Sequence, residues 1–490
     1  MLYRSTRGSS PAVDSAGAVL SGIAPDGGLY LPEALPAFDW QGCLQKDTIS
    51  MAASLLTALL PGIPDMDTIT RRAYLGKFQT DDLTPTVTVG DFTVLELFRG
   101  PTSAFKDVAL CMLPQLLTAA KEVKGIREDI LILTATSGDT GKAALEGFHD
   151  VPGVKICVFY PDGGVSQVQR AQMVTQEGGN VAVSDVRGNF DDAQTGVKNI
   201  FAACQGKELP FRLSSANSIN IGRLAPQIMY YFRAYRDLLD AGKIALGDEV
   251  NFSVPTGNFG DILAGYLAKL LGLPVGTLIC ASNTNNILTD FFKTGEYDVN
   301  RTFHKTMSPS MDILISSNLE RLLFELYDRD DRAVTRLMDD LKKTGRYELK
   351  EDLKEVLGQE FYADYATEED TAHTIHEVFE QEHYLIDPHT AVAMHVYESY
   401  RRTSGDRTPT VVASTANPYK FTPDVLFALT EKKEKDAFLA AGRLKLVTGE
   451  PIPPRIAELK TKEILHDNFA RKDELGDVAL HFAGGQHGRN

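Results

Sequence analysis

A lysine in residues 100–107 has the setting of a reactive amine. Lys106 follows an aromatic residue, stands after a Gly-Pro turn and precedes residues 108–117, whose apolar spacing predicts a helix. Partial burial would lower the pKa of this amine and favour its neutral form, which is the form that makes imines with carbonyl groups. Most lysines that precede a helix are solvated, so this segment alone indicates no particular reaction.

A glycine-containing loop at residues 134–142 follows a predicted buried strand and opens a predicted helix. Hydroxyl groups and free backbone amides at such a helix start can hold an anion, because the helix dipole is positive there. A P-loop does not fit, since Thr136 stands where that motif needs glycine and Ala143 stands where it needs a hydroxyl. A plain strand-to-helix turn remains the alternative for this loop.

A second loop of the same design lies at residues 255–261. Gly257 and Gly260 would let backbone N–H groups approach phosphate oxygens closely, at the start of an apolar helix predicted for residues 262–271. The spacing is G-x-x-G rather than G-x-G-x-x-G, so it does not indicate a dinucleotide site. Taken alone, this loop is weak evidence for any ligand.

The histidines do not indicate a metal site. His373 and His376 share a helical stretch, but no H-E-x-x-H pattern is present, and such a pair is typical of a helix surface. His389, in the segment Asp-Pro-His-Thr, could lie near a site, although a structural role is the favoured interpretation. The chain contains no G-x-S-x-G elbow of a serine hydrolase.

The composition is that of an ordinary globular protein, because 43% of the 490 residues are hydrophobic and 24% are charged. The net charge of -16 argues against a nucleic-acid-binding protein and against binding to anionic membranes. No apolar run is long enough for a transmembrane helix, the start lacks an apolar signal core, and the five cysteines are scattered. These features predict a cytoplasmic protein, or a mature organellar form, with free thiols.

From about residue 90, short apolar segments alternate with glycine-rich turns and helices. Predicted buried strands lie at residues 130–136, 154–160, 250–254 and 411–415. This alternation predicts an α/β fold of mainly parallel sheets flanked by helices. In such folds the ligand groups gather on loops at the carboxyl ends of the strands.

Composition divides the chain into three parts. Residues 1–85 form a small N-terminal region with a predicted helix at 47–60, residues 86–430 form the main region, and residues 431–490 form a C-terminal segment. Within the main region, residues 318–385 are rich in charges of both signs, which favours a solvated helical insertion. Residues 476–490 are expected to be a loosely held tail.

Taken together and in order, these segments resemble the threonine synthase family. That family belongs to the fold type II enzymes that use pyridoxal 5'-phosphate, the class that includes the tryptophan synthase β chain. The similarity extends over nearly the whole chain and fits the family's longer bacterial and fungal branch. It is carried by residues 5–8, 24–30, 100–107, 136–141, 257–261, 285–288, 308–313, 387–391 and 414–421. Asn417 and Tyr419 depart from the family pattern, in which His and Ala are expected.

The resemblance implies a two-lobed catalytic region at residues 86–430 that binds pyridoxal 5'-phosphate, with the Schiff base on Lys106. It implies that the cofactor phosphate is held by Gly257, Asn258, Phe259, Gly260 and Asp261, and that Thr415 meets the pyridine nitrogen. The residues implied to face the substrate carboxylate and the ring hydroxyl are Thr136, Ser137, Asp139 and Thr140. Candidates for the substrate phosphate are Ser166, Asn217, Asn220 and Arg223, although Arg223 could equally be a structural salt-bridge partner.

The reaction implied by the resemblance converts O-phospho-L-homoserine and water to L-threonine and phosphate. Phosphate leaves the γ-carbon, water adds at the β-carbon, and Lys106 moves the protons as general base and acid. The alternatives are a related synthase that acts on another phosphorylated amino acid, and a non-catalytic homologue that binds the cofactor and regulates. The expected partner is a small phosphorylated amino acid, with the protein a monomer or a homodimer.

Overall fold

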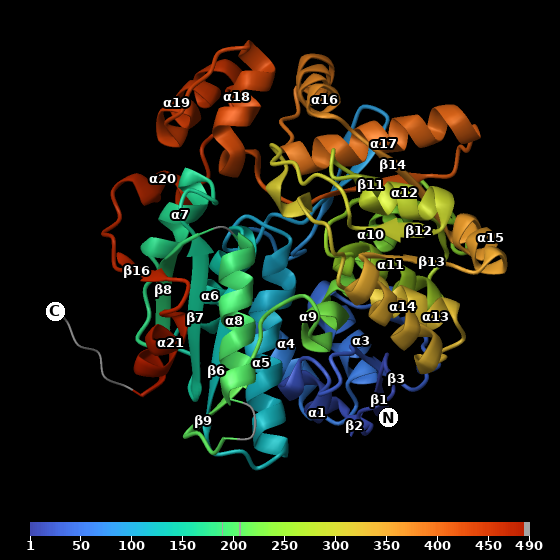
Figure 1. Ribbon diagram of the computed structural model, residues 1–490. Coiled ribbons are helices and arrows are strands. Elements are labelled where there is room, and N and C mark those ends of the chain that lie inside the picture. Colours follow the sequence, from blue (N-terminus) through green and yellow to red (C-terminus); the bar gives the residue numbers. More distant parts are fainter. Residues whose placement is uncertain (189, 205–206, 485–490) are drawn as a thin grey trace.

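Two lobes make up most of the molecule, and each is built around one sheet (Figure 1). The computed structural model describes residues 1–188, 190–204 and 207–484. One lobe contains a six-stranded sheet and the other a five-stranded sheet, and smaller three-stranded and two-stranded sheets accompany them. The predicted α/β architecture, with mainly parallel sheets flanked by helices and a small N-terminal region, is confirmed.

The six-stranded sheet is parallel except at one edge. Its order is β14 (Phe361–Tyr365), β11 (Val275–Ser282), β10 (Val250–Pro255), β15 (Thr410–Ser414), β5 (Phe92–Glu96) and β4 (Thr86–Val89). The edge strand β4 forms an antiparallel hairpin with β5. Every residue of β10 and β15 is buried, as expected for parallel strands covered on both faces, and both strands match the predictions for this part of the chain.

All neighbouring strands of the five-stranded sheet run parallel. Its order is β16 (Asn468–Arg471), β8 (Val181–Arg187), β7 (Val154–Pro161), β6 (Asp129–Ala135) and β9 (Phe211–Ser214). Strands β6 and β7 match the predicted strands because their apolar runs are nearly continuous, which is typical of strands covered on both faces.

Helices cover both sheets. In the five-stranded lobe they are α5 (Lys106–Val123), α6 (Asp139–Phe148), α7 (Gln167–Val174), α8 (Phe190–Cys204) and α21 (Leu475–Ala483). Around the six-stranded sheet they include α10 (Ile228–Asp240), α11 (Gly260–Leu270), α12 (Ile287–Thr294), α16 (Glu368–Glu382) and α17 (Pro388–Ser404), and the short helix α9 (Ile221–Leu224) packs on α5. Near the C-terminus are α18 (Thr422–Thr430), α19 (Ala437–Thr448) and α20 (Pro454–Ala457), and the 3-10 turns are η1 (Ala225–Gln227), η2 (Pro309–Met311), η3 (Pro418–Phe421) and η4 (Glu458–Lys460). Among the described residues, no helix is both long and apolar enough to cross a membrane.

The N-terminal region packs against the lysine-bearing helix α5. Its elements are β1 (Leu2–Ser5), β2 (Val13–Asp14), α1 (Ser15–Ser21), β3 (Tyr30–Pro32), α2 (Trp40–Leu44), α3 (Thr48–Leu59) and α4 (Met66–Tyr74). Asp47 caps α3, the helix predicted at 47–60, by accepting from the backbone N–H of Ser50. The hydroxyl of Tyr74 donates to the carbonyl of Val108 at 2.9 Å, so the region is fixed to the first turn of α5.

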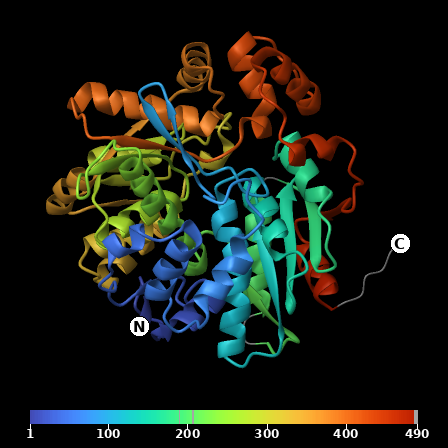
Figure 2. The ribbon, with the colours of Figure 1, turned by 180° about the vertical axis from the view of Figure 1, so that it is seen from behind.

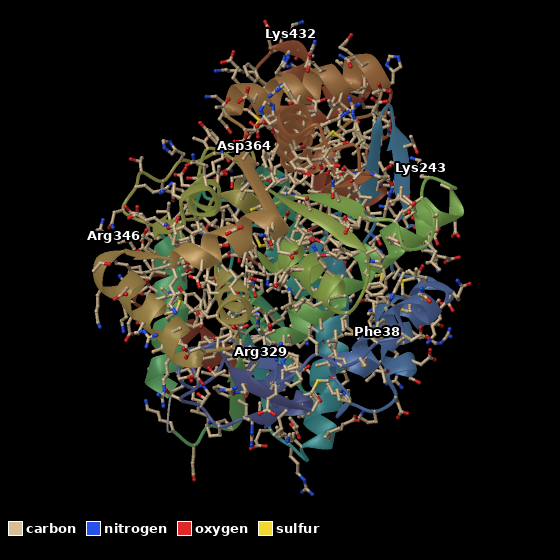
Figure 3. All side chains as sticks on the ribbon, turned by 90° about the vertical axis from the view of Figure 1, so that its right-hand side faces the viewer. Phe38, Lys243, Arg329, Arg346, Asp364 and Lys432 are labelled. Atoms are coloured by element: carbon tan, nitrogen blue, oxygen red, sulfur yellow. The ribbon has the colours of Figure 1, made fainter. Side chains whose placement is uncertain are left out.

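The hairpin of β4 and β5 runs along the back of the molecule toward α17 (Figure 2). Phe92 of β5 meets Tyr397 of α17 edge to face, with 6.0 Å between the ring centroids. Lys243 lies beside the hairpin (Figure 3) and donates to the hydroxyls of Thr88 and Thr93 at 2.8 and 3.1 Å. Both faces of the hairpin are therefore held, which fixes the strand that leads into residues 97–106.

The interpretation of residues 318–385 as a solvated insertion is wrong for part of that range. Helix α13 (Leu319–Leu326) is almost wholly buried, and β14 is an edge strand of the six-stranded sheet. The guanidinium of Arg321 is fully buried and donates to the carbonyls of Tyr30 and Ile219. Arg329 also reaches the N-terminal region, where it donates to the carbonyl of Pro32 at 2.9 Å (Figure 3). Composition cannot distinguish charges that are solvated from charges that are buried and hydrogen-bonded.

The rest of that range is more exposed. It contains α14 (Asp331–Thr344), β13 (Arg346–Glu348), which pairs with β12 (Glu296–Asp298), and α15 (Glu351–Glu360). Few residues of α14 and α15 are buried, so the charge-rich interpretation agrees with these two helices.

The expectation of a loose tail at 476–490 is wrong for most of its length. Helix α21 buries Leu475, Ala479 and Phe482 against the five-stranded lobe, and β16 pairs with β8. This helix is only nine residues long and is followed at once by glycine in the sequence, so its apolar residues form too short a pattern to indicate a helix. Residues 485–490 lie outside the described residues.

Candidate active site

Three segments of the site leave neighbouring strands of the six-stranded sheet. Lys106 follows β5, Thr415 follows β15, and the glycine loop 256–259 follows β10. Because β10, β15 and β5 are adjacent and parallel, their carboxyl ends lie at the same edge. The backbone N–H of Phe105 donates to the carbonyl of Thr415 at 2.8 Å, so the lysine segment and the Thr415 segment are bonded directly.

Lys106 is the first residue of α5, and it is 9% exposed. Its Nζ lies 4.4 Å from the centroid of the Phe105 ring. Burial lowers the pKa of Lys106 to about 8, a shift that the charge of Asp139 opposes and the charges of Arg223 and Lys420 reinforce. A substantial fraction of this amine is therefore neutral near physiological pH.

The glycine loop before α11 is closely packed and hydrogen-bonded by the residues around it. A Cβ atom added to Gly257 would lie 2.6 Å from the carbonyl oxygen of Ser310, so no side chain fits there. Ser316 donates through its hydroxyl to the Gly257 carbonyl at 2.7 Å, and the side chain of Asn318 donates to the Asn258 carbonyl at 3.0 Å. The first N–H groups of α11 have no partner within the helix, which makes them available to an anion.

Two residues of this loop contribute to packing and shape. Phe259 adopts a left-handed backbone conformation, with φ of 62, and its buried ring stacks on Phe292 at 6.0 Å. Gly260 is less constrained than Gly257, since an added Cβ would meet its nearest neighbour, the amide of Asn318, at 3.5 Å.

Asp261 is anchored by a tyrosine. Its carboxylate accepts from the hydroxyl of Tyr231 at 2.7 Å, which ties the first turn of α11 to α10. Burial raises the pKa of Asp261 to about 6, although the nearby hydroxyl groups of Tyr231 and Tyr230 and the charge of Lys106 act against the rise. Its Oδ2 has no hydrogen-bond partner among the described residues.

The loop of the five-stranded lobe presents side chains rather than bare backbone. The hydroxyl of Thr136 accepts from the backbone N–H groups of Gly138 and Gly141, each at 2.9 Å, and so closes the turn before α6. Asp139 is buried and forms an ion pair with Lys420 at 2.7 Å. Ser137 and Thr140 are half-buried beside it.

The charge of Asp139 is stabilised by its neighbours. Burial acts to raise the pKa of this carboxyl, but the ammonium groups of Lys420 and Lys106 and a hydrogen bond from Gln169 outweigh it. The pKa of Asp139 is therefore held well below its usual value, and the residue is ionised throughout the physiological range.

The four candidates for the substrate phosphate differ in whether their side chains already form hydrogen bonds within the fold. Ser166 and Gln169 form a capping box at the start of α7. Asn220 caps α9, accepting from Gly222 N at 2.8 Å and donating to the carbonyl of Val19 at 3.0 Å, so its side chain is already used by the fold. Asn217 is half-buried nearby.

Arg223 is a buried cation without a carboxylate partner among the described residues, and it is 2% exposed. One guanidinium nitrogen donates to the carbonyl of Ala216, and Nε has no partner in the described part of the chain. Burial lowers the pKa of Arg223 to about 10. The alternative of a structural salt bridge therefore finds no partner in these residues.

The site residue that the sequence analysis missed is Lys420. It is fully buried, pairs with Asp139 and donates to the carbonyl of Thr102 at 2.9 Å, so it ties the five-stranded lobe to the segment before Lys106. A lysine within the otherwise uncharged residues 414–421 was the available signal. The two departures nearby have local roles, because Asn417 caps η3 and the hydroxyl of Tyr419 donates to the carbonyl of Glu450.

These groups fit pyridoxal 5'-phosphate on observations of the site itself. Lys106 offers a buried amine with a lowered pKa, and the start of α11 offers amides beside a glycine that leaves no space for a side chain. A family described as pyridoxal-phosphate dependent enzyme matches residues 83–415. Families described as threonine synthase N terminus and threonine synthase, C-terminal match residues 2–54 and 390–474.

The threonine synthase of Pseudomonas aeruginosa is 42% identical over 428 residues, which cover 86% of this chain and 89% of that protein. The chain belongs to the threonine synthase family. Threonine synthase-like 1 of Macaca fascicularis is 38% identical over 436 residues, or 85% of this chain, and the match spans 58% of the length of that longer relative.

Solved threonine synthases have the same fold. The PLP-bound threonine synthase from Brucella melitensis is 38% identical and superposes with a TM-score of 0.87, covering 99% of each chain. The threonine synthase from yeast is 34% identical with a TM-score of 0.87, covering 98% of each chain. The predicted family, fold type and cofactor are thereby confirmed.

Proposed function

We propose that this protein converts O-phospho-L-homoserine and water to L-threonine and inorganic phosphate. The observation that carries the proposal is a buried lysine whose pKa is lowered to about 8, bonded through its loop to the residues that follow β15 and electrostatically coupled to Asp139 and Arg223. This combination provides an amine for the cofactor and both signs of charge for a zwitterionic, phosphorylated substrate.

The six-stranded lobe would hold the cofactor. Backbone amides of Gly257, Asn258, Phe259 and Gly260 at the start of α11 would bind its phosphate, since the helix dipole favours an anion there. The hydroxyl of Thr415 would meet the pyridine nitrogen. Asp261 would act from behind the loop, because its carboxylate is already bonded to Tyr231 and would repel a phosphate at close range. When bound, pyridoxal phosphate supplies an electron sink for charge that develops on the substrate carbons.

Lys106 would move the protons. A pKa of about 8 lets this amine accept a proton from one substrate carbon and return it to another near neutral pH, without a large energetic cost in either direction. Burial beside the Phe105 ring excludes water from the amine, which limits exchange of that proton with solvent.

The five-stranded lobe would bind the amino-acid end of the substrate. The hydroxyls of Ser137 and Thr140 and the backbone N–H groups at the start of α6 would donate to the substrate carboxylate, while Thr136 keeps the turn closed. Asp139, as a permanent anion, balances the charges of Lys420 and Lys106. Arg223 would bind the substrate phosphate through the donors that the fold leaves free, and Ser166 and Asn217 are further candidates for the same role.

The substrate assignment is tested by a coupled phosphate assay, with mass-spectrometric identification of the product. O-phosphohomoserine should give threonine and phosphate, and homoserine should be almost inert, because phosphate is the better leaving group and a pocket for a dianion is left with unpaired donors when the anion is absent. O-phosphoserine is the competing substrate. Faster turnover of O-phosphoserine would refute the threonine assignment and leave Lys106 unaffected.

The role of Arg223 has its own test. Arg223→Met should raise KM for O-phosphohomoserine by about tenfold or more, and Arg223→Lys should restore part of the loss because it keeps the charge. Affinity for the cofactor should change little in both variants. An unchanged KM in Arg223→Met would assign the substrate phosphate to other residues.

We also propose that the protein works in the cytoplasm as a monomer or a homodimer. All five cysteines are free thiols, which is what a reducing compartment favours. Light scattering of the purified holoenzyme would give the mass of the assembly, and fractionation of the source cells would give the location.

A further inference from the structure

Asp387 is connected through hydrogen bonds both to Ser310, beside the loop that precedes α11, and to Ser414 at the end of β15. It is fully buried and caps α17 by accepting from the backbone N–H groups of His389 and Thr390. Each of its oxygens accepts a second bond, one from the His389 ring and one from the Thr390 hydroxyl. Capping a helix requires neither of these side-chain bonds.

The first side-chain bond leads to the phosphate loop. The Nδ1 atom of His389 lies 2.6 Å from the carboxylate of Asp387, and Nε2 accepts from the backbone N–H of Ser310 at 3.2 Å. Because Nε2 accepts, the proton of a neutral ring is on Nδ1, where it is donated to Asp387. The carbonyl of Ser310 in turn packs directly against Gly257, so a shift of Ser310 would open the loop that precedes α11.

The second side-chain bond leads to the strand that ends at Thr415. The hydroxyl of Thr390 donates its single proton to Asp387, so it must accept from the hydroxyl of Ser414, which lies 2.8 Å away. Thr390 and Ser414 are both buried. Ser414 is the last residue of β15 and immediately precedes Thr415.

We propose that Asp387 is a positioning residue that fixes both ends of the cofactor site, the Gly257 end through His389 and Ser310 and the Thr415 end through Thr390 and Ser414. The inference rests on the proposed function only for the identity of the group held between those ends. The competing explanation is an ordinary helix cap, which would contribute to stability alone.

Asp387→Asn separates the two explanations, because asparagine caps helices as well as aspartate does. Its amide has one acceptor atom and one donor group, whereas Asp387 accepts at both oxygens. If the amide nitrogen faces His389, the ring must move its proton to Nε2, where it opposes the N–H of Ser310. If the amide nitrogen faces Thr390 instead, the bond order toward Ser414 is reversed. Either orientation breaks one connection.

The experiment measures the full-length protein with and without cofactor. Asp387→Asn should lower affinity for pyridoxal phosphate by about tenfold or more, because one end of the site loses its support, whereas an ordinary helix cap predicts no change in this affinity. Without cofactor, hydrogen exchange at residues 308–312 and 255–260 should become faster. Asp330→Asn, at the exposed cap of α14, is the matched control and should change neither quantity.

Two substitutions of His389 still test the proposal if Asp387→Asn folds poorly. His389→Gln can still accept from Ser310 and should stay close to wild type, whereas His389→Leu cannot accept and should show the faster exchange and the weaker cofactor binding. Thr390→Val should shift the near-visible absorption of the bound cofactor without changing exchange at residues 308–312.

The proposal is overturned if Asp387→Asn binds cofactor within twofold of wild type with unchanged exchange at residues 308–312, or if His389→Gln and His389→Leu behave alike. None of these measurements uses a substrate. A failed assay with O-phosphohomoserine would therefore contradict the proposed function and leave this inference standing.

Discussion

The two lobes present different kinds of groups to the site. From the six-stranded lobe comes a glycine loop whose usable donors are backbone amides, held in place by Ser316 and Asn318. From the five-stranded lobe come side chains, with the buried charge of Asp139 balanced by Lys420. Backbone donors suit a group that is the same in every turnover, and side chains suit a group whose identity must be selected. We therefore expect substitutions in different lobes to change binding of the cofactor phosphate and choice of the substrate.

Lys106→Ala removes the group on which both lobes act and should have the largest effect. Turnover should fall by about a thousandfold or more, because both the covalent attachment and the proton transfer are lost. Borohydride reduction followed by mass spectrometry should find no cofactor-modified lysine. Lys121→Ala, at the far end of the same helix, is the control and should keep activity and the reducible link. A reducible adduct on another lysine would refute the assignment.

Asp139→Asn disrupts the charged group that the five-stranded lobe presents to the site, because it leaves the buried Lys420 without its counter-ion. Denaturant unfolding of the protein without cofactor should show a loss of about 3 kcal/mol, the usual cost of breaking a buried ion pair. The pKa of Asp139 is lowered in the folded state, so its contribution is present above the unfolded value of 3.8 and is lost as pH falls through the folded value. The difference between wild type and variant should therefore be full at pH 7 and shrink in strong acid.

The double variant Asp139→Asn with Lys420→Met is the control for that pair. Because it removes both charges, it should recover much of the stability lost in Asp139→Asn. Equal losses in the single and double variants would show that the ion pair is not the source of the effect.

Gly257→Ala disrupts the glycine loop that the six-stranded lobe presents to the site. Its Cβ would collide with the carbonyl of Ser310, so cofactor affinity should fall on the order of thirtyfold, which corresponds to about 2 kcal/mol. Gly260→Ala is the matched control, because its Cβ has room, and it should stay within about threefold of wild type. Fluorescence titration with pyridoxal phosphate measures both. Equal effects at the two glycines would count against the close approach at Gly257.

The pH dependence of cofactor attachment tests the pKa of Lys106, and it should show the smallest of the expected effects. The neutral amine of Lys106 is the reactive form, and its pKa is about 8 in the folded protein. The rate at which the cofactor-free protein forms the covalent link should rise by about tenfold between pH 7 and pH 9 and level off above that range. A rise centred near 10, as for a solvated lysine, would contradict the effect of burial.

The core strands were predictable from sequence because parallel strands covered on both faces leave continuous apolar runs. Those runs located β6, β7, β10 and β15. Helix starts were less accurate, since α6 begins at Asp139 and α5 at Lys106 itself, each earlier than its apolar pattern. Polar residues at a helix start carry no periodic signal, although here they are the residues of the site.

The parts of the site that were not predictable depend on contacts between distant segments. The pairing of Lys420 with Asp139 joins residues far apart in the chain, and neither residue type reveals its partner. Asn220 has a residue type suited to phosphate, yet its side chain caps α9. The burial of Arg321 likewise follows from backbone carbonyls of other regions, which composition does not record.

The position of β16 has a consequence for biosynthesis. This four-residue strand pairs with β8, which precedes it by more than half the length of the chain, and so it replaces a seven-residue edge strand with a shorter one. While the ribosome is still translating the intervening segments, β8 is an open edge that can pair with another nascent chain. A transcript that ends before β16 should therefore yield an aggregating product rather than a weakened enzyme.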